Sequence, residues 1–301
     1  MIGHGLMGAS LVLTADVAEG RAHCDQTIAL YSAAEHRQLG ARFGQDVRVS
    51  NLSYRSLALW VLGYPDAALA DMNRAISDAR GTGQAATLMF ALGHAPLTLL
   101  LSGNYVSAAT VIEEVIALSD ETGALLWNVA GKLNRGWLFA LTNKAHDAVH
   151  LITTALAAWR STGASLFVPW HLSCLAKAYS ELGDFDDAWR CISEAVTAIE
   201  ATKETWYEAE VNRIAGEITL LSPGSEAAQA EAYFERALAI ARQQQAKPWE
   251  LRASMSLARL WRDQGKVSEA RELLAPVYGW FTEGFETRDL KEAKALLEEL
   301  A

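Results

Sequence analysis

Cysteine is scarce in this sequence, with only Cys24, Cys174 and Cys191 among 301 residues. An odd number of cysteines without a C-x-x-C spacing offers neither a disulfide framework nor a zinc signature. Few and unpaired cysteines are typical of proteins from a reducing compartment, so we expect a cytoplasmic protein.

Basic residues and long apolar runs are also in short supply. The chain has 26 Lys and Arg against 36 Asp and Glu, which gives a formal net charge of −10. A chain this acidic lacks the basic face that supplies most of the affinity for DNA or RNA. No apolar run reaches the roughly 18 residues that a membrane-spanning helix needs. The short run from Leu6 to Ala15 has no Lys or Arg before it and is expected to be a first packed helix, not a signal peptide.

The common catalytic motifs are missing too. The sequence contains no GxxxxGK[ST], GxSxG or HExxH. One GxGxxG, at Gly3, Gly5 and Gly8, lies too near the start of the chain to follow a strand and is interpreted as chance. His146 and His150 lie four residues apart on one helix face, but no third ligand is evident and polar residues on an outer face are the favoured interpretation. We therefore predict no enzyme activity, no metal and no cofactor.

What the sequence does contain is a period of 40 residues. Gly63, Gly103, Asn143 and Gly183 are 40 apart, and the series continues at Ser225 and Gly265 after one step of 42. A second series runs half a period out of phase through six further positions: Gly83, Gly123, Gly163, Lys203, Gln245 and Gly284. A constant period of this size indicates stacked structural repeats.

Alanine follows each turn of the first series five residues later, at positions 68, 108, 148, 188, 230 and 270. Between the turns, apolar residues recur at helical spacing, as in Val111, Ile112, Val115 and Ile116. A small side chain at the alanine position would let helix B of a repeat press closely on helix A. The pattern predicts an all-α fold, a right-handed α-solenoid of helix-turn-helix repeats.

The two series set the boundaries of a single array over 1–301. Six repeats are predicted at 48–82, 84–122, 124–162, 164–202, 204–245 and 247–283. A partial repeat at 4–33, with Gly20 in the alanine position, and an irregular connector at 34–48 precede them. A capping helix at 290–301 follows, with Asp289 and Glu292 as its capping box. Pro96 and Pro276 are expected to kink or break their helices, and Pro169 to mark the start of its helix.

The segment Trp60-Val-Leu-Gly-Tyr-Pro-Asp-Ala-Ala68 resembles the tetratricopeptide repeat, although 40 residues exceed the usual length of about 34. Lys247-Pro-Trp-Glu-Leu-Arg-Ala253, the run from Leu273 to Phe285 and the run from Asp289 to Leu300 look like the C-terminal region of a bacterial multidomain signalling family. In that family an adenylate/guanylate cyclase-like or other signalling domain and an AAA-type ATPase module precede such an array. The resemblance implies that this chain is the array without its catalytic neighbours.

An aromatic residue lies four positions after successive inter-repeat turns, at Trp127, Phe167, Tyr207 and Trp249, with Trp170 nearby. Packing between repeats is the favoured interpretation, and a groove floor that stacks on a ligand is the alternative. Charged residues on the same predicted A helices supply candidate polar contacts: Lys132, Arg135, Glu210, Arg213 and Arg252. For these, a solvated face with weak ion pairs is the competing interpretation.

The prediction is a non-catalytic scaffold of a bacterial signalling system that binds a protein or peptide partner along the concave surface of the A helices. Its partners could include cyclase or ATPase modules, and exposed end surfaces could support a homodimer. Two alternatives remain open. The chain could be the detached C-terminal part of a cyclase-like or ATPase signalling protein, or it could hold a small molecule inside the superhelix.

Overall fold

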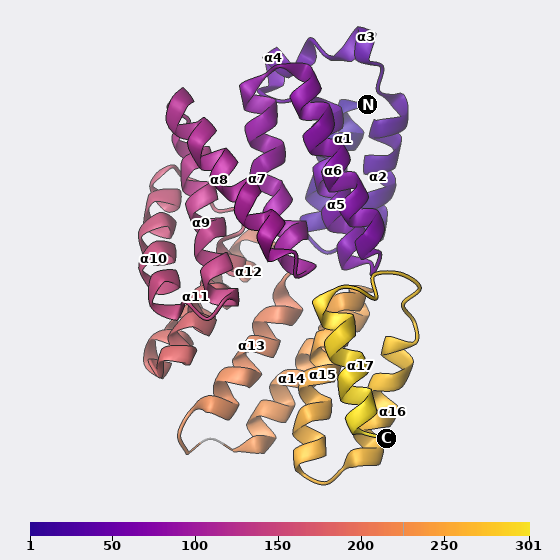
Figure 1. Ribbon diagram of the computed structural model, residues 1–301, viewed down its shortest axis with the longest axis vertical. Coiled ribbons are helices and arrows are strands. Elements are labelled where there is room, and N and C mark those ends of the chain that lie inside the picture. Colours follow the sequence, from indigo (N-terminus) through magenta and orange to yellow (C-terminus); the bar gives the residue numbers. More distant parts are fainter. Residues whose placement is uncertain (225) are drawn as a thin grey trace.

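The computed structural model describes residues 1–224 and 226–301, without the side chain of Ala41, and over these residues it contains helices and no strand. Each repeat pairs an A helix with a B helix (Figure 1). The A helices are α1 (Ile2–Leu13), α5 (Val47–Val61), α7 (Ala85–Leu101), α9 (Leu125–Leu141), α11 (Val168–Leu182), α13 (Glu208–Leu221) and α15 (Lys247–Asp263). The B helices are α2 (Val17–Leu30), α6 (Pro65–Thr82), α8 (Tyr105–Thr122), α10 (Ala145–Ser161), α12 (Phe185–Thr202), α14 (Ala227–Gln243) and α16 (Val267–Tyr278). The short helices α3 (Ala33–His36) and α4 (Leu39–Phe43) lie in the connector, and α17 (Arg288–Glu299) is the last helix.

The turns of both series share a left-handed backbone. The glycines of the two series have φ between 68° and 91°. Among the described residues, the three members that are not glycine adopt the same conformation, with φ of 57° at Asn143, 61° at Lys203 and 55° at Gln245. A left-handed residue after a helix redirects the chain, so the helix-turn-helix geometry imposes this conformation even where the sequence offers a side chain. Ser225 lies outside the described residues.

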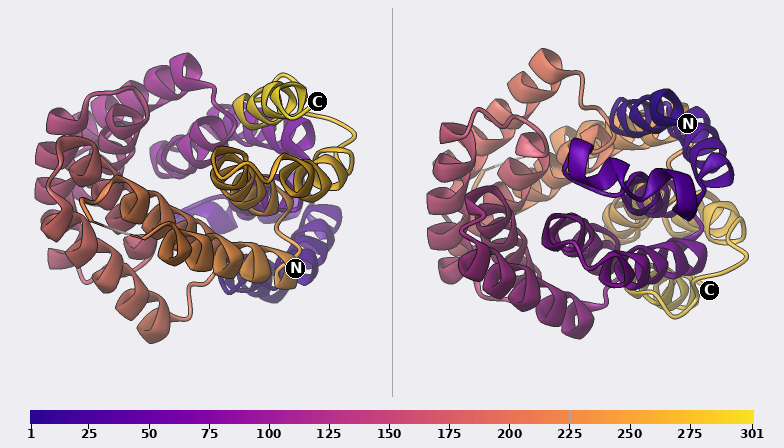
Figure 2. Two further views of the ribbon diagram at one scale, coloured as in Figure 1. Left: turned by 90° about the horizontal axis from the view of Figure 1, so that it is seen from below. Right: turned by 90° about the horizontal axis from the view of Figure 1, so that it is seen from above.

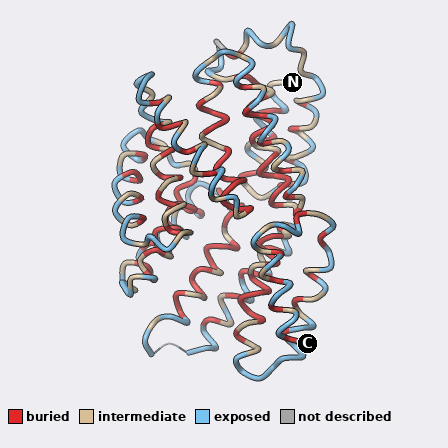
Figure 3. Tube along the Cα trace, viewed as in Figure 1, coloured by how far each residue is buried: buried red, intermediate tan, exposed pale blue. Residues whose placement is uncertain are grey.

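The alanines of the series pack where the sequence places them. Ala68, Ala108, Ala148, Ala188, Ala230 and Ala270 are each 0% exposed. Each one lies near the start of a B helix, fully shielded from solvent, where protein interiors are close-packed. Figure 3 shows the resulting core: α5, α7, α11, α13 and α15 are buried along most of their length, whereas exposed residues recur along the B helices. The expected α-solenoid fold is confirmed.

The solenoid curves so far that its C-terminal repeat reaches the N-terminal repeats (Figure 2). At the N-terminus of α6, the backbone N–H groups of Asp66 and Ala67 donate to Glu283 Oε1 at 3.0 and 3.1 Å, and Gly284 N–H donates back to Asp66 Oδ2 at 3.0 Å. These contacts join residues more than 210 positions apart. They close the array into a ring.

Two more contacts support the closure. The rings of Trp60 and Trp249 meet edge to face with centroids 4.7 Å apart. The carbonyl of Leu13 accepts from the backbone N–H groups of Thr205 and Trp206 at 3.0 and 3.2 Å. An aromatic contact and hydrogen bonds therefore hold the N-terminal and C-terminal repeats together.

Some local expectations need correction. The capping box at Asp289 is wrong, because α17 begins at Arg288 with Thr287 as its N-cap and Asp289 falls in its first turn. Pro96 does not break its helix, since α7 continues to Leu101. Helix α16 ends two residues after Pro276, and Pro169 lies in the first turn of α11, as expected. No described helix is both long and apolar enough to cross a membrane.

Candidate functional site

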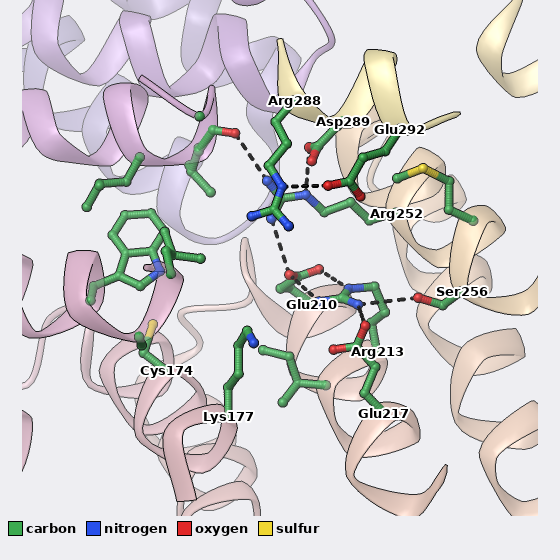
Figure 4. Close-up of a pocket in the computed structure, with 18 of the residues that line it drawn as sticks. Cys174, Lys177, Glu210, Arg213, Glu217, Arg252, Ser256, Arg288, Asp289 and Glu292 are labelled. Atoms are coloured by element: carbon green, nitrogen blue, oxygen red, sulfur yellow. Dashed lines mark hydrogen bonds and ion pairs between the residues drawn. The ribbon is translucent and has the colours of Figure 1, made fainter. Parts of the chain in front are cut away.

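A charged cavity of about 200 Å³ lies inside the ring (Figure 4). The A helices α7, α9, α11, α13 and α15 contribute to its wall, and α17 completes it. Its ionisable lining consists of five basic and four acidic side chains together with two tyrosines and a cysteine. These are Lys177, Arg213, Arg252, Arg259, Arg288, Glu210, Glu217, Asp289, Glu292, Tyr105, Tyr207 and Cys174.

Helix α13 supplies the centre of this cavity. Glu210, Arg213 and Glu217 follow i, i+3 and i+7, which places them on one face of the helix. Arg213 binds Glu210 through two parallel hydrogen bonds, Nε to Oε2 at 2.7 Å and Nη2 to Oε1 at 2.9 Å. Its Nη1 contacts Glu217 and donates to Ser256 Oγ at 3.3 Å. The bidentate pair fixes the orientation of both side chains.

Arg252 of α15 ties the cavity to the ring closure. Its Nε donates to Asp289 Oδ2 at 2.7 Å, and its Nη1 donates to Glu210 Oε1 at 3.2 Å. Its Nη2 donates to the carbonyl of Leu101, at the end of α7, at 3.1 Å. The guanidinium also lies 5.0 Å from the ring centroid of Trp249, a cation–π contact. One side chain thus holds together α7, α13, α15 and α17.

Burial and charge pairing compete in this network. Burial by itself would raise the pKa of Glu210, but Arg213 and Arg252 outweigh it and lower that pKa. Burial disfavours the charged form of Arg213, but Glu210 and Glu217 raise its pKa well above the ordinary value. Burial raises the pKa of Asp289, and the nearby Arg252 offsets this only in part. The Glu210–Arg213 pair therefore stays ionised at neutral pH.

The other side of the cavity is less tightly paired. Arg288 donates from Nε to Glu292 Oε1 at 2.5 Å and from Nη1 to the Tyr105 hydroxyl at 2.9 Å. Arg259 donates from Nη2 to Glu292 Oε2 at 3.3 Å. Lys177 contacts Glu181, which lies one turn further along α11 and outside the cavity lining. In Figure 4 the Lys177 and Arg288 side chains both point into the central space.

The structure brings together four of the residues predicted from sequence: Tyr207, Glu210, Arg213 and Arg252. Trp127 is half-buried against Phe90, with ring centroids 5.7 Å apart. Lys132 is half-buried outside the cavity, and Arg135 pairs with Glu113 of α8.

The aromatic series contributes to the packing between repeats. Phe167, Trp170 and Trp249 are 8%, 2% and 1% exposed. Trp170 meets Trp206 with ring centroids 6.2 Å apart, and Tyr207 meets Trp249 at 5.1 Å. This burial favours the packing interpretation over a groove floor for Phe167, Trp170 and Trp249, while Tyr207 also borders the cavity.

Sequence reasoning missed the part of the site that α17 and the start of α8 supply. The sequence pattern assigns Asp289 and Glu292 only to a helix cap, and it gives no role to Arg288, Tyr105 or Lys177. The acidic and basic residues at i and i+4 in α17 were a visible signal of a charged face, but nothing in the sequence places this face against α13. Among the described residues, no group of three or more His, Cys, Asp or Glu side chains is arranged to hold a metal ion.

No protein-family model matches the chain, and no curated protein matches its sequence. Solved structures do match its fold. The chain is similar to the apo form of RapI, with a TM-score of 0.58 and 12% identity over 99% of this chain and 98% of that chain. It is similar to a Rap protein complexed with competence and sporulation factor, with a TM-score of 0.66 and 12% identity over 99% of this chain and 79% of that chain.

A weaker match is a STAND protein with a tetratricopeptide repeat sensor from Pyrococcus horikoshii. Its TM-score is 0.46 and its identity 12%, over 94% of this chain and 41% of that chain. At 12% identity the two Rap structures establish the fold alone. The chain is an α-solenoid of the tetratricopeptide-like kind.

Proposed function

We propose that this protein is a regulatory binding module that holds a protein or peptide partner at the inner surface of its ring. The observation that carries the proposal is the convergence of the A helices on one charged cavity. Ring closure places residues from α7, α13, α15 and α17 around a single space, and such an arrangement suits recognition of one defined group. The Rap protein whose structure contains competence and sporulation factor is a neighbour with a bound factor, which supports a binding role by analogy of fold.

The charges of the cavity favour a binding role over a purely structural one. A buried ion-pair network is weak evidence for stability, because taking the charges out of water offsets most of their attraction. Here Glu210, Arg213 and Arg252 are bonded to one another and to neighbouring groups, and they form one wall of the cavity. A wall fixed in this way supports the less engaged Arg259 and Arg288, which can donate to a partner.

A screen of synthetic decapeptides against the full chain tests the proposal, followed by isothermal titration of each peptide that binds. We expect Lys177→Ala to weaken binding, because Lys177 borders the cavity. Arg135→Ala is the matched comparison, since Arg135 lies on A helix α9 but outside the cavity lining. If the partner is confined to the cavity, Arg135→Ala should leave its affinity unchanged. If the partner covers the whole inner surface, both variants should lower its affinity. Absence of any peptide binder would contradict the proposal.

A small-molecule sensor is a second candidate, and the size of the cavity favours it. A cavity needs only about 10 to 15 Å³ to hold one water, so about 200 Å³ has room for a small molecule such as an amino acid. A thermal-shift screen with amino acids, sugars and nucleotides would detect such a ligand, because a ligand that binds only the folded form raises the melting temperature.

The bacterial signalling context stays part of the proposal, with cyclase-like or ATPase modules as possible partners. It rests on the resemblance of the segments from Lys247 to Leu300. The test is the genomic neighbourhood: reading frames for such modules beside this one would support the context, and their absence across related genomes would argue against it.

A further inference from the structure

The cavity has more basic than acidic side chains, in a chain whose net charge is −10. Lys177, Arg213, Arg252, Arg259 and Arg288 are opposed by Glu210, Glu217, Asp289 and Glu292, so the lining carries one positive charge in excess. Glu181 contacts Lys177 from outside the lining, between side chains that are 28% and 33% exposed. An exposed pair of this kind is worth little and exchanges readily for another partner.

The basic side chains differ in how fully they are engaged. Arg213 and Arg252 use Nε and both Nη atoms in contacts with the protein. Arg259 makes one hydrogen bond to a described residue, from Nη2, and Arg288 makes two, from Nε and Nη1. Arg259 and Arg288 therefore have N–H groups left to donate to a bound group. Arg213 and Arg252 already use Nε and both Nη atoms in contacts with the protein.

We propose that the cavity binds a single carboxylate group, held by Arg259, Arg288 and Lys177. This inference rests on the proposed binding function and names its ligand chemistry. A guanidinium matches the two oxygens of a carboxylate with parallel hydrogen bonds, and an ammonium adds a compact positive charge. The single excess charge matches a monoanion. A phosphate dianion fits less well, because Glu217 and Glu292 line the same space and would repel its second charge.

The volume limits what carries the carboxylate. About 200 Å³ accommodates one amino acid or the last residue of a peptide, not a folded segment. The carboxylate therefore belongs either to a free small acid or to the C-terminus of a peptide whose remaining residues lie outside the cavity. In either case the carboxylate would contact the same three side chains, Arg259, Arg288 and Lys177.

The test uses the full chain and a panel of N-acetylated dipeptides that covers the twenty C-terminal residues. Each is supplied with a free carboxylate and as its C-terminal amide, beside the free amino acids and inorganic phosphate. We expect at least one acid to raise the melting temperature and to bind in isothermal titration, with affinity at least tenfold above that of its amide. Its affinity should fall as NaCl is added, because the attraction is electrostatic.

Matched variants locate the site. Arg259→Gln and Arg288→Gln should each weaken the acid about tenfold. Arg160→Gln is the control. Arg160 on α10 resembles Arg259, because each side chain is 41% exposed and pairs with one glutamate, but Arg160, which pairs with Glu194, lies outside the cavity lining. Circular dichroism of each variant confirms that it is folded.

Several results would overturn the inference: equal affinity for acids and amides, binding of phosphate but of no carboxylate, binding of no probe, or wild-type affinity in both cavity variants. Decapeptides that bind equally as acids and amides would retain the proposed function and refute only the carboxylate site. Free amino acids that bind while no peptide does would support the carboxylate site and refute the peptide partner.

Discussion

The Glu210–Arg213 pair offers the sharpest test of how the cavity is built. The two side chains are 4% and 11% exposed and share two hydrogen bonds. We expect Glu210→Leu to destabilise the protein, because Arg213 and Arg252 each lose a buried acceptor. Arg213→Leu should also destabilise the protein, because the buried Glu210 carboxylate then keeps only Arg252 as an ion-pair partner. Breaking a buried pair on one side costs about 3 to 5 kcal/mol.

The double variant, Glu210→Leu with Arg213→Leu, should recover most of that loss. Removing both partners eliminates the buried unpaired charge, and Glu217, which is 36% exposed, can be hydrated. The coupling free energy should therefore be about 3 kcal/mol or more. The exposed pair Arg160–Glu194 provides the matched cycle, for which we expect a coupling below about 1 kcal/mol.

Urea unfolding followed by circular dichroism at 222 nm measures these values, with tryptophan fluorescence as a second probe. Coincident transitions are required, since long repeat arrays can unfold in stages. Additive losses in the double variant would refute the reasoning, because they would mean that the two charges do not depend on each other. A coupling as small as that of Arg160–Glu194 would refute it as well.

Three further predictions concern packing, turn strain and pH. Ala148→Leu should cost about 1 to 3 kcal/mol, because Ala148 is 0% exposed in close-packed surroundings, whereas the exposed Ala157→Leu should be nearly neutral; urea midpoints compare the two. Lys203→Gly should raise the melting temperature by relieving a left-handed φ of 61°, and Lys203→Ala, which keeps the strain, should not. Burial raises the pKa of Glu204 from 4.5 to about 7, although hydrogen bonds from Trp206 and Phe167 oppose the shift. The folded state therefore binds the proton more tightly, so the free energy of unfolding should fall by about 3 kcal/mol as pH rises from below 4.5 to above 7, relative to a Glu204→Gln variant that lacks this slope. Equal pH profiles of unfolding in the two proteins would contradict this assignment.

The sequence by itself determined the repeating unit of this protein. Its period of 40 residues located turns such as Lys203 and Gln245, which adopt the left-handed conformation of their glycine counterparts. It also located the alanines that lie fully buried at the start of the B helices. These features depend on contacts within one repeat or between adjacent repeats, so a local pattern is enough to specify them.

Only the tertiary structure decided that the C-terminal repeat contacts the N-terminal repeats and that a charged cavity forms as a result. The hydrogen bonds from Arg252 to the Leu101 carbonyl and from Arg288 to Tyr105 join residues 151 and 183 positions apart. Their formation depends on the curvature summed over the whole array, and a small rotation per repeat would separate them. The charged face of α13 was therefore visible in the sequence, whereas the cavity that it lines follows from the closure of the ring.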